Sequence, residues 1–311
     1  MRLVFAGTPE VAVPSLRALA DGPHEITSVI TRLDAPLGRR RVLTPSPVAN
    51  AASDLALPVH KASRLDDALT AEVAAEAPDL GVIVAYGGLV REPLLSTPRQ
   101  GWINLHFSLL PRWRGAAPVQ RALMAGDAVT GASVFQLVAE LDAGDVFAEE
   151  PYEVPTGATA GDVLSALAER GAALLHRVVD EIADGTATAV AQSGEPTFAP
   201  KLSLIDGAVD WTKDAPAVLA RIRGVTPEPG AHTTIDGARL KILVVRAADE
   251  TGPADEPRLA PGALAARERA ILVGTASEPV ELVSVQPAGK PPMAAADWWR
   301  GLRSENPVVG S

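Results

Sequence analysis

Residues 104–115 read Asn104-Leu-His-Phe-Ser-Leu-Leu-Pro-Arg-Trp-Arg-Gly115, and this stretch decides how the chain folds. Residues 101–107 have the apolar alternation of a short buried strand. Because side chains at i and i+2 share one face of a strand, Asn104 and His106 are predicted to point the same way. An amide and an imidazole at one strand end can bind a carbonyl oxygen and carry a proton. The simpler alternative is that His106 is a core histidine with satisfied hydrogen bonds.

A second polar segment favours a catalytic role for His106 over a purely structural one. Asp142 and Asp145 follow the apolar run 132–138, at the start of a Gly-containing loop. A carboxylate there would orient His106, raise its basicity and relay a proton. Asp142 could instead only cap the strand through an Asx-turn, and spacing alone does not choose between the two aspartates.

The first half of the chain alternates short β-type runs with helical segments. Such alternation predicts a parallel α/β sheet of the Rossmann-like kind, with ligands at the carboxyl ends of the strands. The turn at Gly7 lacks the GxGxxG pattern of a dinucleotide site and either starts a helix or meets an anion. The predicted strands are Leu3–Ala6, Ile26–Thr31, Leu80–Ala85 and Ile103–Phe107, and the predicted helices are Val11–Leu19, Asp66–Ala77 and Pro118–Ala125.

The second half predicts a smaller β domain. One long Ala/Leu-rich helix over 159–184 precedes a polar, Pro/Gly-containing stretch. Short β-type runs then recur at 240–245, 270–273 and 280–285, which suits a small β-barrel. The predicted domains are therefore residues 1–187 and 206–311, joined by a linker over 188–205.

Composition limits the chemistry. The 311 residues are 47% hydrophobic and 21% charged, which is typical of a globular protein. There is no cysteine, so disulfides, zinc–thiolate sites and a thiol nucleophile are excluded. The sequence shows neither a signal peptide nor a run long enough to span a bilayer, and we expect a cytoplasmic protein with no membrane contact.

Charge argues against binding nucleic acid through the overall field. The net charge is −10 and the isoelectric point is about 5.1, whereas proteins held mainly by phosphate contacts are usually basic. A nucleic-acid partner would have to meet a local basic patch, and the best candidate is Arg39-Arg40-Arg41. The alternative is a solvated surface loop, the usual setting of a short charge run.

These motifs together resemble the folate-dependent formyltransferases. The resemblance rests on Asn104, His106, the segment 108–118 and Leu141-Asp-Ala-Gly-Asp145. It extends to the segments 5–10, 43–48, 201–202 and 209–211, and therefore covers nearly the whole chain. The continuation Trp113-Arg-Gly-Ala-Ala-Pro118 is most similar to the methionyl-tRNA formyltransferases.

The resemblance implies roles for particular residues. It places catalysis on Asn104, His106 and Asp142, and so prefers Asp142 to Asp145. It also implies a C-terminal domain similar to an OB-fold that helps to bind tRNA, with Lys241 and Trp298-Trp299-Arg300 as possible contacts, although packing in the barrel is the better interpretation for the tryptophans. The implied folate contacts are Tyr86, Gly87, Ser108, Leu109, Leu110 and Pro111, and the implied tRNA contacts are Arg39, Arg40 and Arg41.

The reaction implied is direct transfer of a formyl group from 10-formyltetrahydrofolate to the α-amine of initiator methionyl-tRNA. Asn104 and protonated His106 would stabilise the oxyanion. Asp142 would keep His106 charged and pass the amine proton to the folate N10. No metal is expected, because one histidine, one amide and one carboxylate hold a cation poorly. We expect a monomer.

Three other functions stay open. A sugar-nucleotide amine formyltransferase would share Asn104, His106 and Asp142, but Arg39 and the segment 113–118 favour tRNA. A formyltetrahydrofolate hydrolase would use water as acceptor, and we expect no N-terminal regulatory domain of the kind such enzymes usually carry. A catalytically silent tRNA- or folate-binding protein would keep its ligands without turnover.

Overall fold

The computed structural model describes residues 1–38, 41–248, 258–267, 270–302 and 306–310. The chain divides into two compact units. The first unit comprises residues 1–118, 129–153 and 164–199, and the second comprises 119–128, 154–163 and 200–311. Each unit is described separately below.

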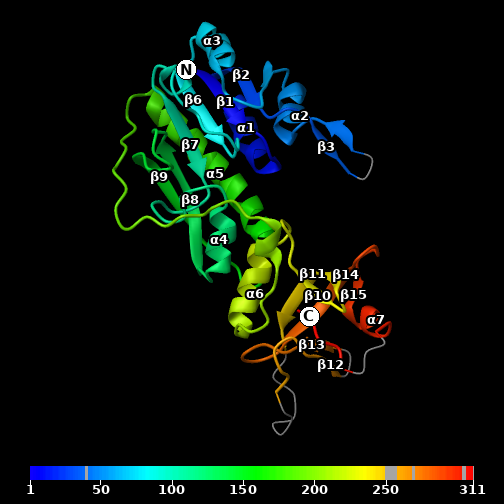
Figure 1. Ribbon diagram of the computed structural model, residues 1–311. Helices are drawn as coiled ribbons and strands as arrows, with labels where there is room; N and C mark the ends of the chain where they lie inside the picture. The colour runs from blue at the N-terminus through cyan, green and yellow to red at the C-terminus, as the bar shows by residue number, and fades with distance from the viewer. Residues whose placement is uncertain (39–40, 249–257, 268–269, 303–305, 311) are drawn as a thin grey trace. The chain divides into compact units, whose positions relative to one another are not determined.

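A seven-stranded sheet forms the centre of the first unit (Figure 1). The strand order is β5-β2-β1-β6-β7-β8-β9, with parallel pairing from β5 to β7 and antiparallel pairing for β8 and β9. This arrangement confirms the predicted α/β class, and β8 and β9 add an antiparallel edge. The strands are β1 (Arg2–Gly7), β2 (Glu25–Thr31), β5 (Val59–Lys61), β6 (Leu80–Val84), β7 (Trp102–His106), β8 (Val129–Gln136) and β9 (Val146–Glu153).

The order of the strands creates a switch point between β1 and β6. The chain adds β2 and β5 on one side of β1, and then adds β6 and β7 on the other side. In open α/β sheets a ligand crevice forms outside the carboxyl ends of the strands at such a point. The loops after β6 and β7 are therefore the part of the fold that is positioned to hold a ligand.

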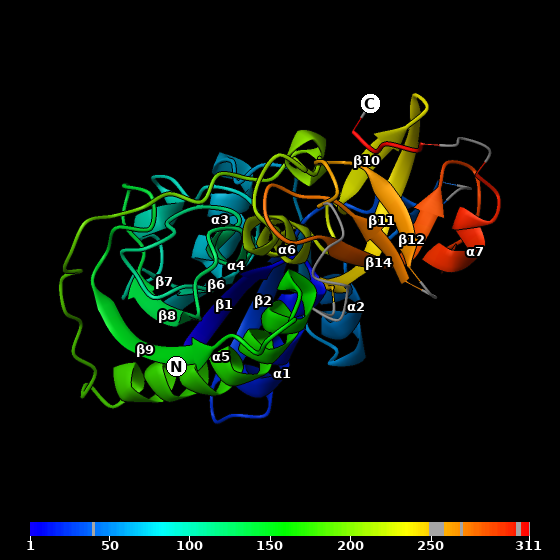
Figure 2. The ribbon, with the colours of Figure 1, turned by 90° about the horizontal axis from the view of Figure 1, so that it is seen from below.

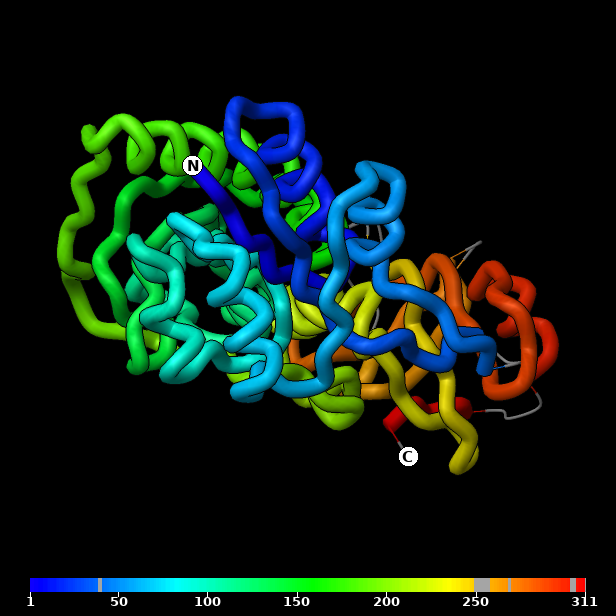
Figure 3. The backbone as a smooth tube through the Cα atoms, turned by 90° about the horizontal axis from the view of Figure 1, so that it is seen from above, coloured from blue at the N-terminus to red at the C-terminus, as the bar shows by residue number. Residues whose placement is uncertain are grey.

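Helices cover both faces of this sheet. Figures 2 and 3 show α1 and α5 on one face and α3 on the other. Side-chain caps fix where two helices begin, because Ser46 accepts a hydrogen bond from the Ala49 amide and Asp66 accepts one from the Leu69 amide. The helices of the chain's described part are α1 (Val13–Ala20), α2 (Pro47–Asp54), α3 (Asp67–Ala75), α4 (Pro118–Met124), α5 (Ala160–Ala183), α6 (Ala215–Gly224) and α7 (Ala295–Trp299), with 3-10 turns at Glu10–Ala12, Leu94–Ser96 and Leu204–Gly207.

The segment after α5 returns along the edge of the sheet. It passes β9 (Figure 1), where Val190 and Val146 exchange backbone hydrogen bonds of 2.9 and 2.8 Å. It then reaches the loop after β7, where Phe198 forms a β-bridge with Arg114. Residues 186–199 thereby support the loop that begins at the end of β7.

A short hairpin occupies the predicted arginine-rich loop. It consists of β3 (Ala35–Leu37) and β4 (Val42–Thr44), which pair antiparallel. Arg41 is exposed in the turn and has a positive φ of 50°. Arg39 and Arg40, two of the predicted tRNA contacts, lie outside the described residues.

The second unit is an antiparallel β structure. Its strand order is β10-β11-β14-β13-β12, and β15 pairs with β14. Residues 308 and 309 form bridges with Ala263 and Ile235, so the C-terminal segment joins both edges of the sheet. The strands are β10 (His232–Ile235), β11 (Ala238–Ala247), β12 (Leu264–Arg267), β13 (Ala270–Val273), β14 (Val280–Pro287) and β15 (Met293–Ala294).

Tryptophans stabilise the core of the second unit. Trp211 and Trp298 are buried with the apolar faces of α6 and the strands, and Trp299 packs against the same core. The indole nitrogen of Trp211 donates a hydrogen bond of 3.0 Å to Thr233 Oγ1. Burial of Trp298 confirms the packing interpretation for that residue. Within the described residues, no helix combines the length and apolar character needed to span a membrane.

Candidate active site

Strand β7 delivers Asn104 and His106 to one end of the sheet. The strand is paired on both sides, with Asn104 opposite Ile83 of β6 and Phe135 of β8. His106 is the last residue of β7 and its ring is buried. Because a strand paired on both sides cannot slip, the backbone positions of the two polar residues are fixed.

His106 is held by three contacts. Its Nε2 lies 2.9 Å from the carbonyl oxygen of Trp113. A carbonyl only accepts hydrogen bonds, so Nε2 carries the proton and donates it. The ring also packs edge-on against Phe135 at a centroid distance of 6.3 Å. The other ring nitrogen, Nδ1, lies 3.9 Å from Oδ2 of Asp142.

Burial dominates the protonation of His106. Removal of the ring from water lowers the pKa of His106 below its usual range, while the nearby Asp142 carboxylate and the Trp113 carbonyl act in the opposite direction. The neutral ring is therefore favoured at neutral pH, in contrast to the charged ring that the resemblance implies. Its Nδ1 then has a free lone pair that faces Asp142.

The carboxylate of Asp142 is fixed by the loop after β7. The backbone amide of Gly115 donates a hydrogen bond of 2.7 Å to Oδ2 of Asp142. Asp142 itself has a left-handed backbone with φ of 45°. The competing Asp145 has an exposed side chain, and its backbone carbonyl accepts a hydrogen bond from Gln136. The tertiary structure thus brings Asp142, and not Asp145, to His106.

Gln192 is a supporting residue that sequence reasoning missed. Its Nε2 donates hydrogen bonds of 2.8 Å to the carbonyl oxygens of both Asp142 and Gly144. Its Oε1 accepts hydrogen bonds of 3.2 and 2.8 Å from Nε and Nη2 of the buried Arg114. Gln192 lies 50 residues from Asp142 along the chain, and nothing in its local sequence marks it.

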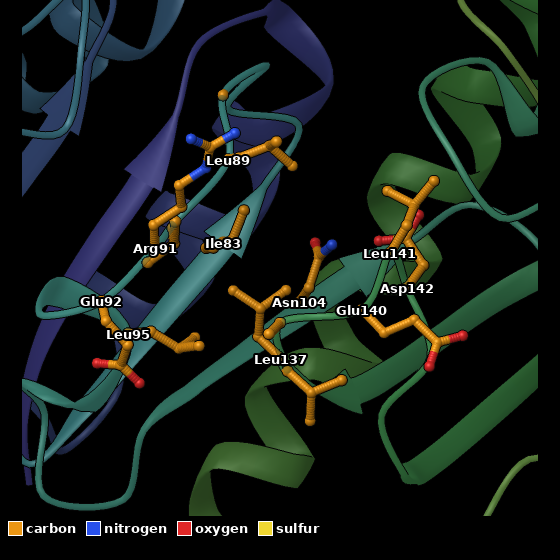
Figure 4. Close-up of a pocket in the computed structure, with 14 residues that line it drawn as sticks. Ile83, Leu89, Arg91, Glu92, Leu95, Asn104, Leu137, Glu140, Leu141 and Asp142 are labelled. Atoms are coloured by element: carbon orange, nitrogen blue, oxygen red, sulfur yellow. The ribbon is translucent and has the colours of Figure 1, made fainter.

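A cavity of about 540 Å³ opens beside these residues. This volume lies within the range of small-molecule sites, roughly 300–1,000 Å³. Two segments, 88–92 and 137–142, form most of its walls, and Figure 4 shows the Asn104 amide directed into the space between them. The lining residues are Ile83, Gly88, Leu89, Val90, Arg91, Glu92, Leu95, Asn104, Leu137, Val138, Ala139, Glu140, Leu141 and Asp142.

The Asn104 amide is free to bind a ligand. Within the described part of the chain, its side chain makes no hydrogen bond. A partly buried amide can donate through its nitrogen and accept through its oxygen. The cavity wall therefore carries an unused amide and the Asp142 carboxylate, and Nδ1 of His106 lies 3.9 Å from that carboxylate.

The predicted folate contacts lie elsewhere. The side chain of Tyr86 is buried in the core, and the neighbouring Gly88, but not Gly87, lines the cavity. Ser108 is fully buried, and its hydroxyl donates to the Arg112 carbonyl at 2.7 Å. The Leu110 amide donates to Ser133 Oγ at 3.2 Å. Ser108, Leu109, Leu110 and Pro111 do not line the described cavity, and their contact with folate stays a prediction.

Comparison with known families agrees with this site. A family model described as "Formyl transferase" matches residues 1–179, and one described as "Formyl transferase, C-terminal domain" matches residues 201–303. The methionyl-tRNA formyltransferase of Clavibacter sepedonicus is 62% identical over 311 residues, which covers 99% of this chain and 100% of that protein. The chain belongs to the methionyl-tRNA formyltransferase family.

Another relative leads to the same assignment. The methionyl-tRNA formyltransferase of Arthrobacter sp. (strain FB24) is 53% identical over 309 residues, with 99% of both chains covered. The protein is therefore an enzyme of the formyltransferase class. Since the matches extend over both units, the family's N-terminal and C-terminal domains are both present.

Solved structures share the fold at much lower identity. The sugar 3N-formyl transferase WlaRD, in the presence of dTDP and 5-N-formyl-THF, has a TM-score of 0.69 at 14% identity, with 94% of this chain and 99% of that one covered. HypX from Aquifex aeolicus, in complex with tetrahydrofolic acid, has a TM-score of 0.59 at 18% identity, with 96% of this chain and 46% of that one covered. At these identities the similarity shows the fold alone.

Proposed function

We propose that this protein transfers a formyl group from 10-formyltetrahydrofolate to the α-amine of initiator methionyl-tRNA, which prepares that tRNA for translation initiation. The observation that carries the proposal is the 62% identity over the whole length of a methionyl-tRNA formyltransferase. The cavity beside Asn104 and Asp142 supports it, because it has the size and the polar groups that a folate ring requires. Folate is a co-substrate here and not a resident cofactor.

The folate ring is proposed to occupy the cavity between segments 88–92 and 137–142. Apolar side chains such as Leu89 and Leu137 contact its flat faces, and backbone groups of both segments meet its polar edge. The formyl group then lies next to Asn104. The predicted contacts of Tyr86, Gly87 and the segment 108–111 are proposed for parts of the folate outside this cavity, since none of these residues lines it.

Catalysis is proposed to combine one amide, one imidazole and one carboxylate. The uncharged amine attacks the formyl carbon, and the Asn104 amide donates a hydrogen bond to the oxygen as it becomes negative. A well-placed donor of this kind contributes about 3–4 kcal/mol to transition-state stabilisation. Asp142 accepts the amine proton, shares it with Nδ1 of the neutral His106 beside it, and returns it to the leaving N10 atom. The bond to N10 breaks as the carbonyl re-forms, after the new C–N bond has been made.

The lowered pKa of His106 supports this proton transfer. Burial makes protonated His106 a stronger acid than a histidine in water, while the Asp142 carboxylate 3.9 Å away stabilises the charged ring transiently. His106 can therefore take a proton and release it within one catalytic cycle. None of these steps requires a covalent enzyme intermediate or a metal.

The tRNA is proposed to contact two regions. The first is the arginine run Arg39-Arg40-Arg41, of which the exposed Arg41 belongs to the described residues. The second is the C-terminal β domain. We further propose the functional limits 1–187, 188–205 and 206–311 for the catalytic domain, the linker and the OB-like domain. We also propose that the protein is a monomer and that it acts in the cytoplasm, where translation begins.

The deciding experiment measures formyl transfer from 10-formyltetrahydrofolate to methionyl-initiator tRNA. Parallel reactions offer a sugar-nucleotide amine or water as the acceptor, and parallel variants carry Asn104→Ala and His106→Ala. We expect transfer to methionyl-tRNA in the wild type and its loss in both variants. If 10-formyltetrahydrofolate is consumed only when the sugar-nucleotide amine or water is present, methionyl-tRNA is not the acceptor. If turnover is unchanged in His106→Ala, His106 does not take part in catalysis.

A further inference from the structure

Thr197 holds the backbone on both sides of Trp113. Its side-chain oxygen Oγ1 accepts a hydrogen bond of 2.9 Å from the Trp113 amide. Its backbone carbonyl accepts a hydrogen bond of 2.8 Å from the Arg114 amide, which belongs to the peptide group that follows Trp113. The two peptide groups that flank the Cα atom of Trp113 are therefore both anchored to one residue of the returning segment 186–199.

Trp113 has a backbone conformation that needs such support. Its φ is 61°, in the left-handed region that a bulky side chain rarely adopts. Residues in this region persist where the surrounding structure determines their conformation, and they concentrate at functional sites. The hydrogen bonds to Thr197 supply this constraint, because they fix the orientation of the peptide group on each side of Trp113.

One of the two anchored peptide groups contacts His106. The Trp113 carbonyl and the Arg114 amide belong to the same planar peptide group, so they point in opposite directions. The amide donates its hydrogen bond to Thr197, and the carbonyl accepts the hydrogen bond of 2.9 Å from Nε2 of His106. Thr197 therefore acts on His106 through one rigid peptide group.

The direction of the Trp113 carbonyl decides which nitrogen of His106 can act as a base. A neutral imidazole carries its proton on one ring nitrogen, and the hydrogen bonds of the ring select which one. With the proton on Nε2, the lone pair remains on Nδ1, which lies 3.9 Å from Oδ2 of Asp142. If the carbonyl turned away, either nitrogen could hold the proton, and some molecules would present an N–H group to Asp142 instead of a lone pair.

We infer that Thr197 is a positioning residue for catalysis, whose side chain holds the Trp113 backbone and thereby keeps neutral His106 protonated at Nε2. This inference rests on the proposed function, in which Nδ1 of His106 shares the proton that Asp142 takes up. Thr197 lies 84 residues from Trp113 along the chain and does not line the cavity beside Asn104. Its contribution is therefore to the proton transfer and not to the binding of folate.

The test compares the wild type with Thr197→Val and Thr197→Ser, as full chains that carry isotope-labelled histidine. Valine has the shape of threonine without the oxygen, and serine keeps the oxygen. Long-range proton–nitrogen NMR spectra at neutral pH distinguish protonated from unprotonated ring nitrogens, and the signals lost in His106→Gln identify His106. We expect the Nε2-protonated tautomer in the wild type and in Thr197→Ser, and a mixture of both tautomers in Thr197→Val.

Formyl transfer to methionyl-tRNA provides the second readout. In Thr197→Val we expect kcat to fall about twofold to tenfold, the factor that one neutral hydrogen bond provides. The Kd for 5-formyltetrahydrofolate, measured by fluorescence titration, should keep its wild-type value, because neither Thr197 nor Trp113 lines the cavity. Thr197→Ser should recover most of the wild-type kcat.

Thr186→Val is the matched control. Thr186 lies in the same returning segment, where its Oγ1 donates a hydrogen bond of 3.3 Å to the Glu181 carbonyl at the end of α5. This variant also removes one hydrogen bond from a side chain to the backbone, and it should keep the wild-type tautomer and kcat. A wild-type His106 protonated at Nδ1 would overturn the inference, whether or not Thr197→Val folds. The same tautomer in Thr197→Val as in the wild type, or an equal change in Thr186→Val, would also overturn it.

The two readouts separate this inference from the proposed function. If Thr197→Val changes the tautomer but the wild type transfers no formyl group to methionyl-tRNA, Thr197 still positions His106 and the proposed acceptor falls. If the wild type transfers the formyl group and the tautomer does not depend on Thr197, the proposed function stands and the inference falls. A changed tautomer with an unchanged kcat would remove Thr197 from catalysis.

Discussion

The backbone amide of Gly115 donates its hydrogen bond to the same Asp142 oxygen that faces Nδ1 of His106. Gly115 follows the loop that leaves β7, and its neighbour Ala117 donates a hydrogen bond to the carbonyl of Ala199. The position of the carboxylate thus depends on the returning segment 186–199 as well as on the strand that carries His106. This relationship makes the loop part of the catalytic geometry.

Gly115→Ala is expected to reduce activity through this contact. Gly115 has φ of 123°, and a Cβ atom there would lie 2.8 Å from the Ala199 carbonyl oxygen. The loop must move, and Asp142 loses its hydrogen bond. Because a displacement of about 1 Å in an active site can lower rates on the order of 10²-fold, we expect a loss of that size in kcat/KM.

The control for Gly115→Ala is Gly185→Ala. Gly185 also has a positive φ, 71°, but its Cβ would meet nothing within 4 Å. Both variants therefore carry backbone strain, and only the first disturbs Asp142. Equal activities for the two variants, measured as initial rates of formyl transfer, would show that the Gly115 contact does not position the carboxylate.

Asp142→Asn tests the proton transfer directly. The side-chain oxygen of Asn can still accept the Gly115 hydrogen bond, so the fold is expected to remain. The amide cannot take up the amine proton, and general-base catalysis of this kind contributes about 10²- to 10⁴-fold. We expect kcat to fall by that factor with the thermal midpoint changed little. Asp145→Asn, in the same loop, is the control and should retain wild-type kcat.

Gln192→Leu tests the support behind the site. The leucine removes the two donors to the Asp142 and Gly144 carbonyls and the acceptor for Arg114. An unpaired buried polar group costs about 1–3 kcal/mol, so a lower thermal midpoint is expected together with a lower kcat. Gln192→Glu keeps the acceptor for Arg114 but loses the donors, and should recover stability more than activity. Full activity in Gln192→Leu would count against a positioning role.

The lowered pKa of His106 predicts how stability depends on pH. The unfolded state gains a proton near the ordinary histidine pKa of 6.5, whereas the folded state gains it only at lower pH. Between these two values the unfolded state binds more protons, so acid favours unfolding with a slope of up to about 1.4 kcal/mol per pH unit. The variant His106→Gln lacks this titrating group, so its free energy of unfolding should fall less than that of the wild type as the pH is lowered.

Urea unfolding at pH 7.5 and pH 5.5 measures this difference. The free energy of unfolding of the wild type should fall more than that of His106→Gln over this interval, since all other titrating groups are shared. Parallel losses in the two proteins would mean that His106 keeps an ordinary pKa in the folded state.

Much of the first unit follows from local pattern. The strands predicted at 3–6, 26–31, 80–85 and 103–107 are found within a residue or so at each end, because buried parallel strands require short continuous apolar runs. The prediction of a surface loop around the arginine run was wrong in part, because the flanking residues Ala35–Leu37 and Val42–Thr44 pair as strands β3 and β4. Pairing of short exposed strands depends on a partner across a turn, which pattern alone represents poorly.

The sequence by itself determined the alternating α/β order, the shared face of Asn104 and His106, and the absence of thiol chemistry, because these depend on neighbours in the chain or on composition. The resemblance already preferred Asp142 to Asp145, but only the tertiary structure showed that the Asp142 carboxylate faces His106 and that Gln192 supports the loop. These relationships join residues from tens of positions apart, and the packing of the strands and the return of segment 186–199 bring them together.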